Sequence, residues 1–423
     1  MKLRIQNVAK IKSAELELNG ITVITGNNNS GKSTVGKAIF SIYNSLVNVE
    51  ERITAQKEKL IYQMLIRKAE DLSVQEDGMF SGIRISPVII RRYANEMTCE
   101  VQESGLREII EEFCQRLRKD SDENVSEIME EVYRIKNLPE ERLIKSAISA
   151  YFDSIFNSEI NNVYHLDEEA ILETEIKGRE IRIAFRENSC VELQKQINIL
   201  NEAIYLDNPF ILDCLNNGTN GLEQIERTAL NKLRKNTDIM ENVVQYNFIE
   251  DRMQEVLDKI NEVSSGSVQR DEARSYCYKE KNTAVKLNVN NLSAGLKSFV
   301  IIKTLLENGA LKEKDVLILD EPEIHLHPAW QMVYAEVIVL LQKTFELTIV
   351  LTTHSSHFLE ALQLYAKKHG VTEKCSYYLS ENEDDGCTLK DVSDDITKIY
   401  SQLVEPSILL DKLRSELEEA EDD

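Results

Sequence analysis

The N-terminal positions alternate between apolar and polar residues in the way that predicts β-strands. Positions 3–5 and 16–18 each show this alternation, and the Asn-Gly pair at 19–20 is a strong turn signal between strands. Positions 21–25 form a short apolar run that predicts a buried strand, and a helix is predicted from about 31 to 43. The chain therefore begins with predicted strands, a glycine-containing loop and a helix.

The middle of the chain is dominated by helical spacing. Positions 49–156 are rich in Glu, Lys, Arg, Leu and Ile, with apolar residues at helical intervals but no lasting heptad repeat. This pattern predicts packed helices or a short helical hairpin, not an extended coiled coil. Alternation across 170–185, around Lys177-Gly178, predicts a β-hairpin, and 221–263 is a second helical tract.

Short apolar strands separated by helices return near the C-terminus, at 316–319, 348–351 and 375–379. The two ends therefore predict one α/β sheet domain into which the helical middle is inserted. The predicted segments are 1–48 as the first part of the sheet domain, 49–160 as a helical insertion, 161–220 as strands and a helix returning to the sheet, 221–265 as a second helical segment, and 266–423 as the remainder with an acidic tail.

Composition narrows the class of protein. The 423 residues are 42% hydrophobic and 29% charged, which is typical of a folded chain and excludes a disordered one. No apolar run approaches the roughly 20 residues that span a bilayer, and the first residues lack a secretory signal, so we expect no membrane association. The seven scattered cysteines include no C-x-x-C pair, which argues against disulfides or zinc and indicates a cytoplasmic protein.

The formal net charge of −23 predicts long-range repulsion of nucleic acid. Any contact with DNA would therefore need a local basic patch or a partner protein. Part of the acidity lies at the C-terminus, which we interpret as a solvated tail. Its acidic residues are Glu416, Glu418, Glu419, Glu421, Asp422 and Asp423.

A phosphate-binding pattern, G-x-x-x-x-G-K-[ST], follows the predicted strand at 21–25. Its two glycines let the loop wrap a phosphate, so that backbone N–H groups point inward at the start of a helix. Lys32 is predicted to reach the β- and γ-phosphates of a nucleotide, and the Ser33 hydroxyl to bind Mg²⁺. The predicted nucleotide-binding residues are Gly26, Asn27, Asn28, Asn29, Ser30, Gly31, Lys32, Ser33 and Thr34.

A second predicted site follows the apolar run at 316–319. Four aliphatic residues predict a strand that is buried on both faces, so Asp320 emerges at its carboxyl end beside the phosphate loop. Asp320 is predicted to hold Mg²⁺ directly or through water. Glu321 is predicted to orient and deprotonate the attacking water as a general base. A strand ending in Asp-Glu is common alone, but together with a phosphate loop it indicates nucleotide hydrolysis.

The helix predicted from 293 to about 308 begins with residue types that suit a phosphate, Ser293 and Gly295. Taken alone, Ser293 is equally well explained as an ordinary N-cap. The order of the motifs decides between the two interpretations. A phosphate loop, this helix start, the Asp-Glu strand and then His354 after the next strand follow one another along the chain.

This order resembles the ABC-type ATPases. The four sites resemble their Walker A motif, signature motif (here LSAGLK in place of the common LSGGQ), Walker B motif and switch histidine. The resemblance implies a P-loop NTPase fold of the ABC-ATPase head type, with a mixed sheet and long helical insertions. It also implies that the protein hydrolyses ATP, that His354 contacts the γ-phosphate, and that two copies dimerise around ATP, with Ser293 and Gly295 meeting nucleotide held by the other copy.

Two histidines near the Asp-Glu strand invite a metal assignment. His325 and His327 are two positions apart, with Glu323 before them. They occupy a segment in which a similar Glu-x-x-Leu-His-Pro sequence recurs in one branch of this family. A structural or dimer-contact role is therefore favoured over zinc binding.

That branch contains RecF, the OLD-type and SMC-like ATPases, and the ATPase subunits of bacterial anti-phage systems such as Septu and PARIS. The likeness lies in the N-terminal strands, the segment 321–328 and the long insertions between Lys32 and Ser293, which transporter ATPases lack. The residues after Phe358 are too few for the Toprim nuclease domain of OLD proteins. The resemblance therefore implies an ATPase that controls a separate effector protein, expected to be a nuclease, in phage defence.

Two other functions stay open at this point. One is a RecF-like DNA-repair ATPase that binds DNA directly, for which salt-dependent duplex binding would be diagnostic. The other is an ATP-switched scaffold with little turnover. That scaffold would still assemble after Glu321→Gln and would show no measurable hydrolysis.

Overall fold

The computed structural model describes residues 1–73, 86–117, 121–176, 178–195, 199, 201–219, 221–234, 253–273, 275–281, 283 and 285–421. The chain divides into two compact units. The first comprises Met1–Val47 and Ser149–Asp423, and the second Asn48–Ile148. The second unit falls almost wholly within the helical insertion predicted at 49–160.

Eleven strands of the described residues form one mixed sheet in the first unit. Across the sheet they are β6 (Ser189–Lys195), β5 (Arg179–Arg186), β4 (Ala170–Ile176), β1 (Lys2–Val8), β2 (Ile11–Glu17), β14 (Gly386–Asp391), β13 (Cys375–Glu383), β3 (Ile21–Gly26), β12 (Thr348–Thr352), β11 (Val316–Asp320) and β7 (Ala203–Leu206). Pairing is parallel from β13 to β7 and antiparallel from β6 to β2. The predicted α/β mixed sheet is confirmed.

The chain bends at positions 19–20, where the sequence predicts a turn, but the strands on either side of it do not pair. Gly20 has a left-handed φ of 97°, yet β14 and β13 lie between β2 and β3 in the sheet. The N-terminal hairpin is formed by β1 and β2 instead. The physical reason is burial, since every residue of β3 is buried and such a strand belongs at the centre of a sheet.

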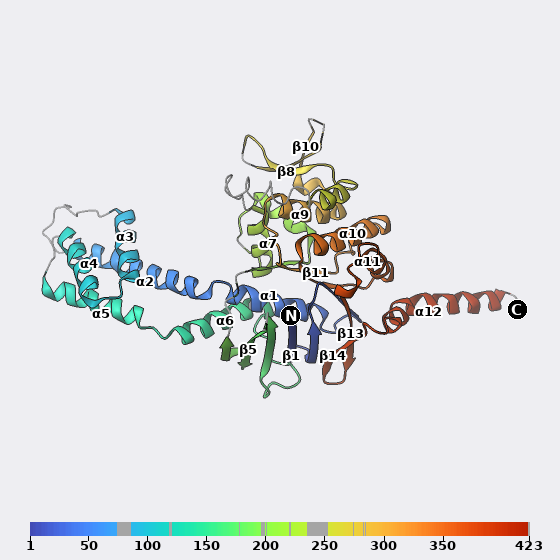
Figure 1. The fold of residues 1–423 in the computed structure, drawn as a ribbon, viewed down its shortest axis with the longest axis horizontal. Coiled ribbons are helices and arrows are strands. Elements are labelled where there is room, and N and C mark those ends of the chain that lie inside the picture. Colours follow the sequence, from blue (N-terminus) through green and yellow to red (C-terminus); the bar gives the residue numbers. More distant parts are fainter. Residues whose placement is uncertain are drawn as a thin grey trace. The chain divides into compact units, whose positions relative to one another are not determined.

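Helices cover both faces of the parallel part of the sheet (Figure 1). Alternate side chains of β3, β11 and β12, such as Leu317 and Leu319, pack into one core with α9 (Ala294–Glu307), α10 (Pro328–Phe345) and α11 (Ser356–Lys368). On the other face, Gly36 of α1 (Lys32–Leu46) packs against Ile318 and Tyr205. The continuous apolar runs in the sequence reflect this burial on both faces.

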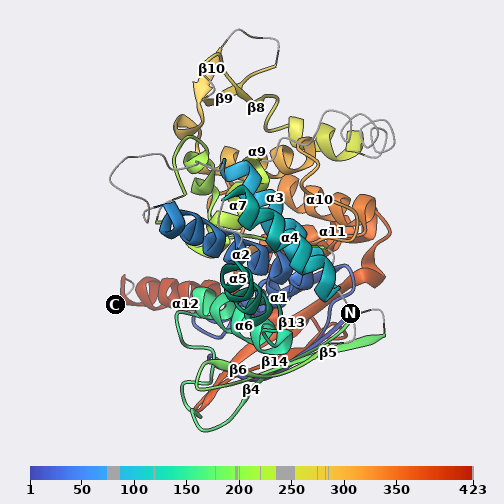
Figure 2. The ribbon, with the colours of Figure 1, turned by 90° about the vertical axis from the view of Figure 1, so that its left-hand side faces the viewer.

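The remaining elements of the first unit surround this core. A three-stranded sheet of β8 (Ser267–Arg270), β9 (Tyr276–Lys279) and β10 (Lys286–Asn288) lies beside α9 in both views (Figures 1 and 2). This unit also contains the helices η1 (Pro209–Asn216), α7 (Gln224–Arg234), η2 (Val289–Asn291), η3 (Thr372–Lys374) and α12 (Thr397–Glu421).

Three further predictions can be compared with these elements: the hairpin at 170–185, the helical tract at 221–263 and the acidic tail. β4 and β5 pair antiparallel from Ala170 opposite Phe185, which confirms the hairpin, although Lys177 at its turn lies outside the described residues. The second helical tract corresponds to α7 and a helix at 253–261, while 235–252 lie outside them too. α12 carries the acidic tail as far as Glu421, and Asp422 and Asp423 are not described.

The second unit is a set of packed helices, as predicted (Figure 2). It contains α2 (Val49–Ser73), α3 (Pro87–Cys99), α4 (Glu103–Arg116), α5 (Asp122–Lys136) and α6 (Glu140–Phe156) as far as Ile148. Ser86 and Ser121 cap α3 and α5 by accepting bonds from backbone N–H groups. The core of the unit includes Ile61, Leu65, Tyr93, Ile110, Phe113 and Val132. In the part of the chain that is described, no helix has the length and apolar character required to cross a membrane.

Candidate functional site

The phosphate loop connects β3 to α1, as the motif predicts. Its two glycines adopt positive φ angles, 142° at Gly26 and 82° at Gly31. A side chain at Gly31 would place its Cβ only 2.6 Å from the Cys387 sulfur, so the loop requires glycine there for space as well as for conformation. The side chains between the glycines, at 27–29, are exposed.

The start of α1 is suited to an anion. Its N-cap, Gly31, has no side chain, and none of the described side chains caps the helix, so its first N–H groups are available to a phosphate. Lys32 is buried, and its Nζ donates to the carbonyl oxygens of Gly26 at 3.1 Å and Asn27 at 2.7 Å. Burial lowers the pKa of Lys32, whereas the nearby carboxylates of Glu321 and Asp320 act to raise it. The N–H groups at the start of α1 and the Lys32 ammonium are therefore suited to bind a nucleoside triphosphate.

Asp320 is held in place by two hydroxyl groups from the strands on either side of β11. Its Oδ2 accepts a hydrogen bond of 2.7 Å from the Tyr205 hydroxyl of β7, and its Oδ1 accepts one of 2.5 Å from Thr352 Oγ1 of β12. The sequence motifs did not reveal either partner. Thr352 lies directly opposite Asp320 in the parallel register, a relation that only the strand order establishes.

The donor chemistry at this edge fits magnesium. The predicted ligands, Asp320 and the half-exposed Ser33 in the first turn of α1, both offer oxygen, which Mg²⁺ prefers. Among the described residues there is no group of three or more His, Cys, Asp or Glu that could hold a metal alone. Mg²⁺ is usually bound by one or two protein ligands together with substrate phosphates and water.

Glu321 and His354 face each other across the ends of β11 and β12. Glu321 adopts a left-handed φ of 48°, and its N–H donates to Thr352 Oγ1 at 3.0 Å. Its Oε1 lies 3.2 Å from Nε2 of His354. Partial burial and the positive charge of Lys32 lower the pKa of His354 below 6.5, although Glu321 opposes the shift.

The predicted signature residues lie at the start of α9, a helix whose residues Ser298 and Ile301 line the same pocket as Asp320 and Glu321. Ser293 is exposed and caps α9, its Oγ accepting from the Leu296 N–H at 3.4 Å. Gly295 is buried, and a Cβ there would lie 2.9 Å from the His325 carbonyl oxygen. α9 packs on the opposite face of the sheet from α1. Gly295 is therefore required for close packing, while Ser293 is presented to solvent.

Both histidines that invited a metal assignment make structural contacts. The His325 ring meets Phe210 edge-on with their centroids 5.7 Å apart. His327 caps α10, its Nδ1 accepting from the Ala329 N–H at 3.3 Å.

One further acidic residue was missed by sequence reasoning. Asp207 directly follows β7 and lines the same pocket as Asp320 and Glu321, but it belongs to no motif.

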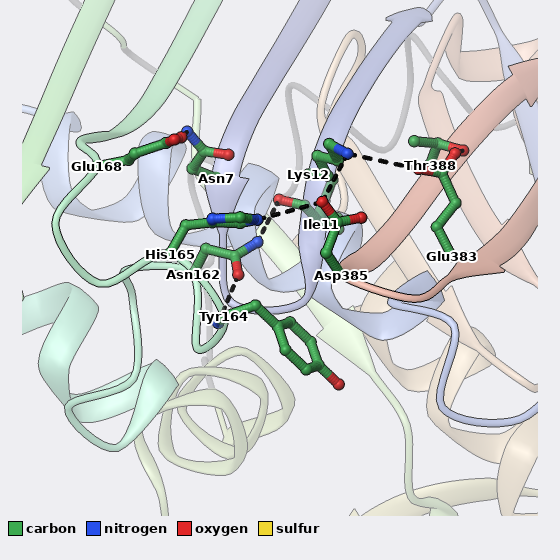
Figure 3. A network of polar contacts seen from close by, with 10 residues as sticks. All are labelled: Asn7, Ile11, Lys12, Asn162, Tyr164, His165, Glu168, Glu383, Asp385 and Thr388. Carbon is green, nitrogen blue, oxygen red and sulfur yellow. Dashed lines mark hydrogen bonds and ion pairs between the residues drawn. The ribbon is translucent and has the colours of Figure 1, made fainter.

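A polar network supports the sheet next to the phosphate loop (Figure 3). Lys12 Nζ lies 2.7 Å from Asp385 Oδ2, and His165 Nε2 lies 3.3 Å from the same oxygen. The residue before Lys12, Ile11, packs its side chain against the position of Gly31. Because these charged groups are partly exposed, their ion pairs contribute little to the free energy of unfolding. We ascribe to them the alignment of β2 with the β13–β14 hairpin instead.

Several known proteins resemble the chain over very different extents. A stretch of 105 residues is 31% identical to the Retron Ec83 probable ATPase of Escherichia coli, and it covers 22% of this chain and 19% of that relative. The structure of the SmcHead bound to the C-winged helix domain of ScpA is 11% identical, with a TM-score of 0.44, over 94% of this chain and 98% of that one. The SMC head domain from Thermotoga maritima is 12% identical, with a TM-score of 0.39, over 92% and 98%.

The AAA ATPase domain family matches residues 1–359. The matched region includes the phosphate loop, Asp320, Glu321 and His354. Because the match covers most of the chain and contains the whole cluster described above, this protein belongs to the AAA ATPase domain family.

Proposed function

We propose that this ATPase dimerises around ATP and controls a separate effector protein in anti-phage defence. The observation that carries the dimer is the exposure of Ser293 at the N-terminus of α9. Lys32, Asp320, Glu321 and His354 gather at one edge of the sheet. The Ser293 hydroxyl caps α9 within one chain and is exposed, so it is accessible to nucleotide held by a second copy.

Within one chain, each residue of the cluster has a distinct role in hydrolysis. The loop N–H groups and Lys32 bind the β- and γ-phosphates. Ser33 and Asp320 would hold Mg²⁺, which neutralises phosphate charge when bound. Glu321 accepts the proton of the attacking water, and His354, at 3.2 Å from it, senses the γ-phosphate. The hydroxyl groups of Tyr205 and Thr352 keep Asp320 oriented.

Two-fold symmetry completes both sites at once, because the same surface serves each copy. ATP then holds the dimer together, and hydrolysis weakens it, which provides two states that an effector can distinguish. The defence role is supported by the resemblance of the motifs to Septu and PARIS ATPase subunits and by the short likeness to a retron-associated ATPase.

The completed site predicts complementation between two inactive variants. Lys32→Ala removes the phosphate-binding cation from the loop of its own chain, and Ser293→Arg blocks the surface that completes the loop of the partner chain. In a heterodimer of the two variants both defects therefore fall in the same site. We expect each variant alone to be inactive in an ATPase assay. An equal mixture should recover activity, because a heterodimer retains one site with both intact halves.

The control is each variant mixed with itself, with subunit exchange followed by differently labelled chains. A mixture that exchanges subunits and recovers no ATPase activity would contradict the dimer. So would full activity of Ser293→Arg alone.

If the chain controls an effector, the activity of that effector should depend on the nucleotide site. We expect a nuclease encoded beside this chain to co-purify with it, and the DNA cleavage of that complex to change on adding ATP. The response should be absent with Lys32→Ala, measured on the same purified complex. Salt-dependent binding of duplex DNA by the chain alone, with no such partner, would favour the RecF-like alternative instead.

A further inference from the structure

Glu323 is a buried carboxylate in an otherwise accessible loop. Its exposed fraction is 4%, whereas its neighbour Ile324 is 62% exposed. Burying a carboxylate is unfavourable unless hydrogen bonds compensate for lost water. Burial accordingly raises the pKa of Glu323, while bonds from Thr353 and from backbone N–H groups oppose that shift. The position of this side chain therefore depends on its partners.

Those partners are the residues at the end of β12. Oε1 of Glu323 accepts a hydrogen bond of 2.6 Å from Thr353 Oγ1 and one of 3.0 Å from the backbone N–H of His354. Thr353 is itself fully buried, and its Oγ1 accepts from the Ser355 N–H at 3.0 Å. Among the described residues, Oε2 of Glu323 has no hydrogen-bond partner. A single oxygen thus supports the backbone at His354.

Other hydrogen bonds also join the segment that follows β11 to the segment at the end of β12. The N–H of Glu321 donates to Thr352 Oγ1, and Gln331 joins the Glu323 carbonyl oxygen to Ser355. These bonds would keep the two segments together without Glu323. The Glu323 carboxylate differs from them because it holds the backbone of the residue whose imidazole lies 3.2 Å from Glu321.

We propose that Glu323 is a positioning residue, whose carboxylate sets the distance between His354 and Glu321 and thereby the rate of hydrolysis. This inference rests on the proposed roles of those two residues. Because Glu323 acts through His354 and does not contact the nucleotide, removing its carboxylate lowers the rate of hydrolysis and leaves the affinity for ATP unchanged. The bond geometry matters more than the charge, because the two donors are a hydroxyl and a backbone N–H.

The experiment compares three substitutions by kcat, by KM for ATP and by equilibrium binding of a fluorescent ATP analogue. We expect Glu323→Ala to lower kcat about 10–100-fold, since small misplacements of reacting groups have effects of this size, with KM and binding changed less than about 3-fold. Glu323→Gln keeps an acceptor at Oε1 and should restore most of the rate. Glu323→Asp keeps the charge but withdraws the oxygen, so it should remain slow. Glu373→Ala, at an exposed position, is the control.

A double-mutant cycle separates positioning from general structural damage. In a His354→Ala background, Glu323→Ala should cause no further loss of kcat, because the group that it positions is already gone. Independent, multiplicative losses would overturn the proposal, as would parent-like turnover of Glu323→Ala. If Glu323→Ala does not fold, Glu323→Asp decides, and parent-like turnover of that variant overturns it. Absence of hydrolysis by the parent chain would contradict the proposed function instead.

Discussion

Glu321→Gln is expected to slow ATP hydrolysis by about 10²–10⁴-fold while ATP stays bound, because a positioned general base contributes a factor of this size. Glutamine has nearly the same shape but does not accept the proton of the attacking water. The backbone should not move, since the Glu321 N–H is bonded to Thr352. Single-turnover hydrolysis and equilibrium ATP binding, measured on the same preparation, give the two quantities.

The matched comparison is His354→Ala, which should also bind ATP and hydrolyse it poorly. Its effect should be smaller than that of Glu321→Gln if the histidine only senses the γ-phosphate. Loss of ATP binding together with turnover in Glu321→Gln would show a metal-binding or structural role for Glu321. The assignment of the general base would then be wrong.

Lys32→Ala is expected to abolish ATP binding or hydrolysis. The Lys32 side chain is buried, and its Nζ donates to two loop carbonyl oxygens, so its charge lies at the loop that we propose binds the triphosphate. Alanine removes that charge and leaves those carbonyl oxygens without their donor. ATP binding by calorimetry and phosphate release at saturating ATP measure the two effects.

Lys367→Ala provides the control for a lysine lost elsewhere, because Lys367 is exposed on α11. It should bind and hydrolyse ATP like the parent chain. Thermal unfolding should show that the Lys32→Ala chain is folded. If that folded variant hydrolyses ATP at the parent rate, the phosphate-loop assignment fails.

The sequence by itself determined the elements whose causes are local. The phosphate loop is one continuous segment, and its glycines are required by the loop conformation, so the pattern alone located Lys32 and Ser33. The apolar runs at β3, β11 and β12 indicated strands buried on both faces, which placed Asp320, Glu321 and His354 at strand ends. Helical spacing likewise predicted the packed helices of 49–156.

Only the tertiary structure decided which of these segments are neighbours. The turn at 19–20 suggested pairing, but β13 and β14 lie between the strands that it joins. Strand order also brings the Tyr205 and Thr352 hydroxyls to Asp320 and the Glu323 carboxylate to the backbone of His354. The physical reason is that periodicity records which face of an element is buried. Pairing between distant segments depends on how the apolar faces of all the elements are covered at the same time.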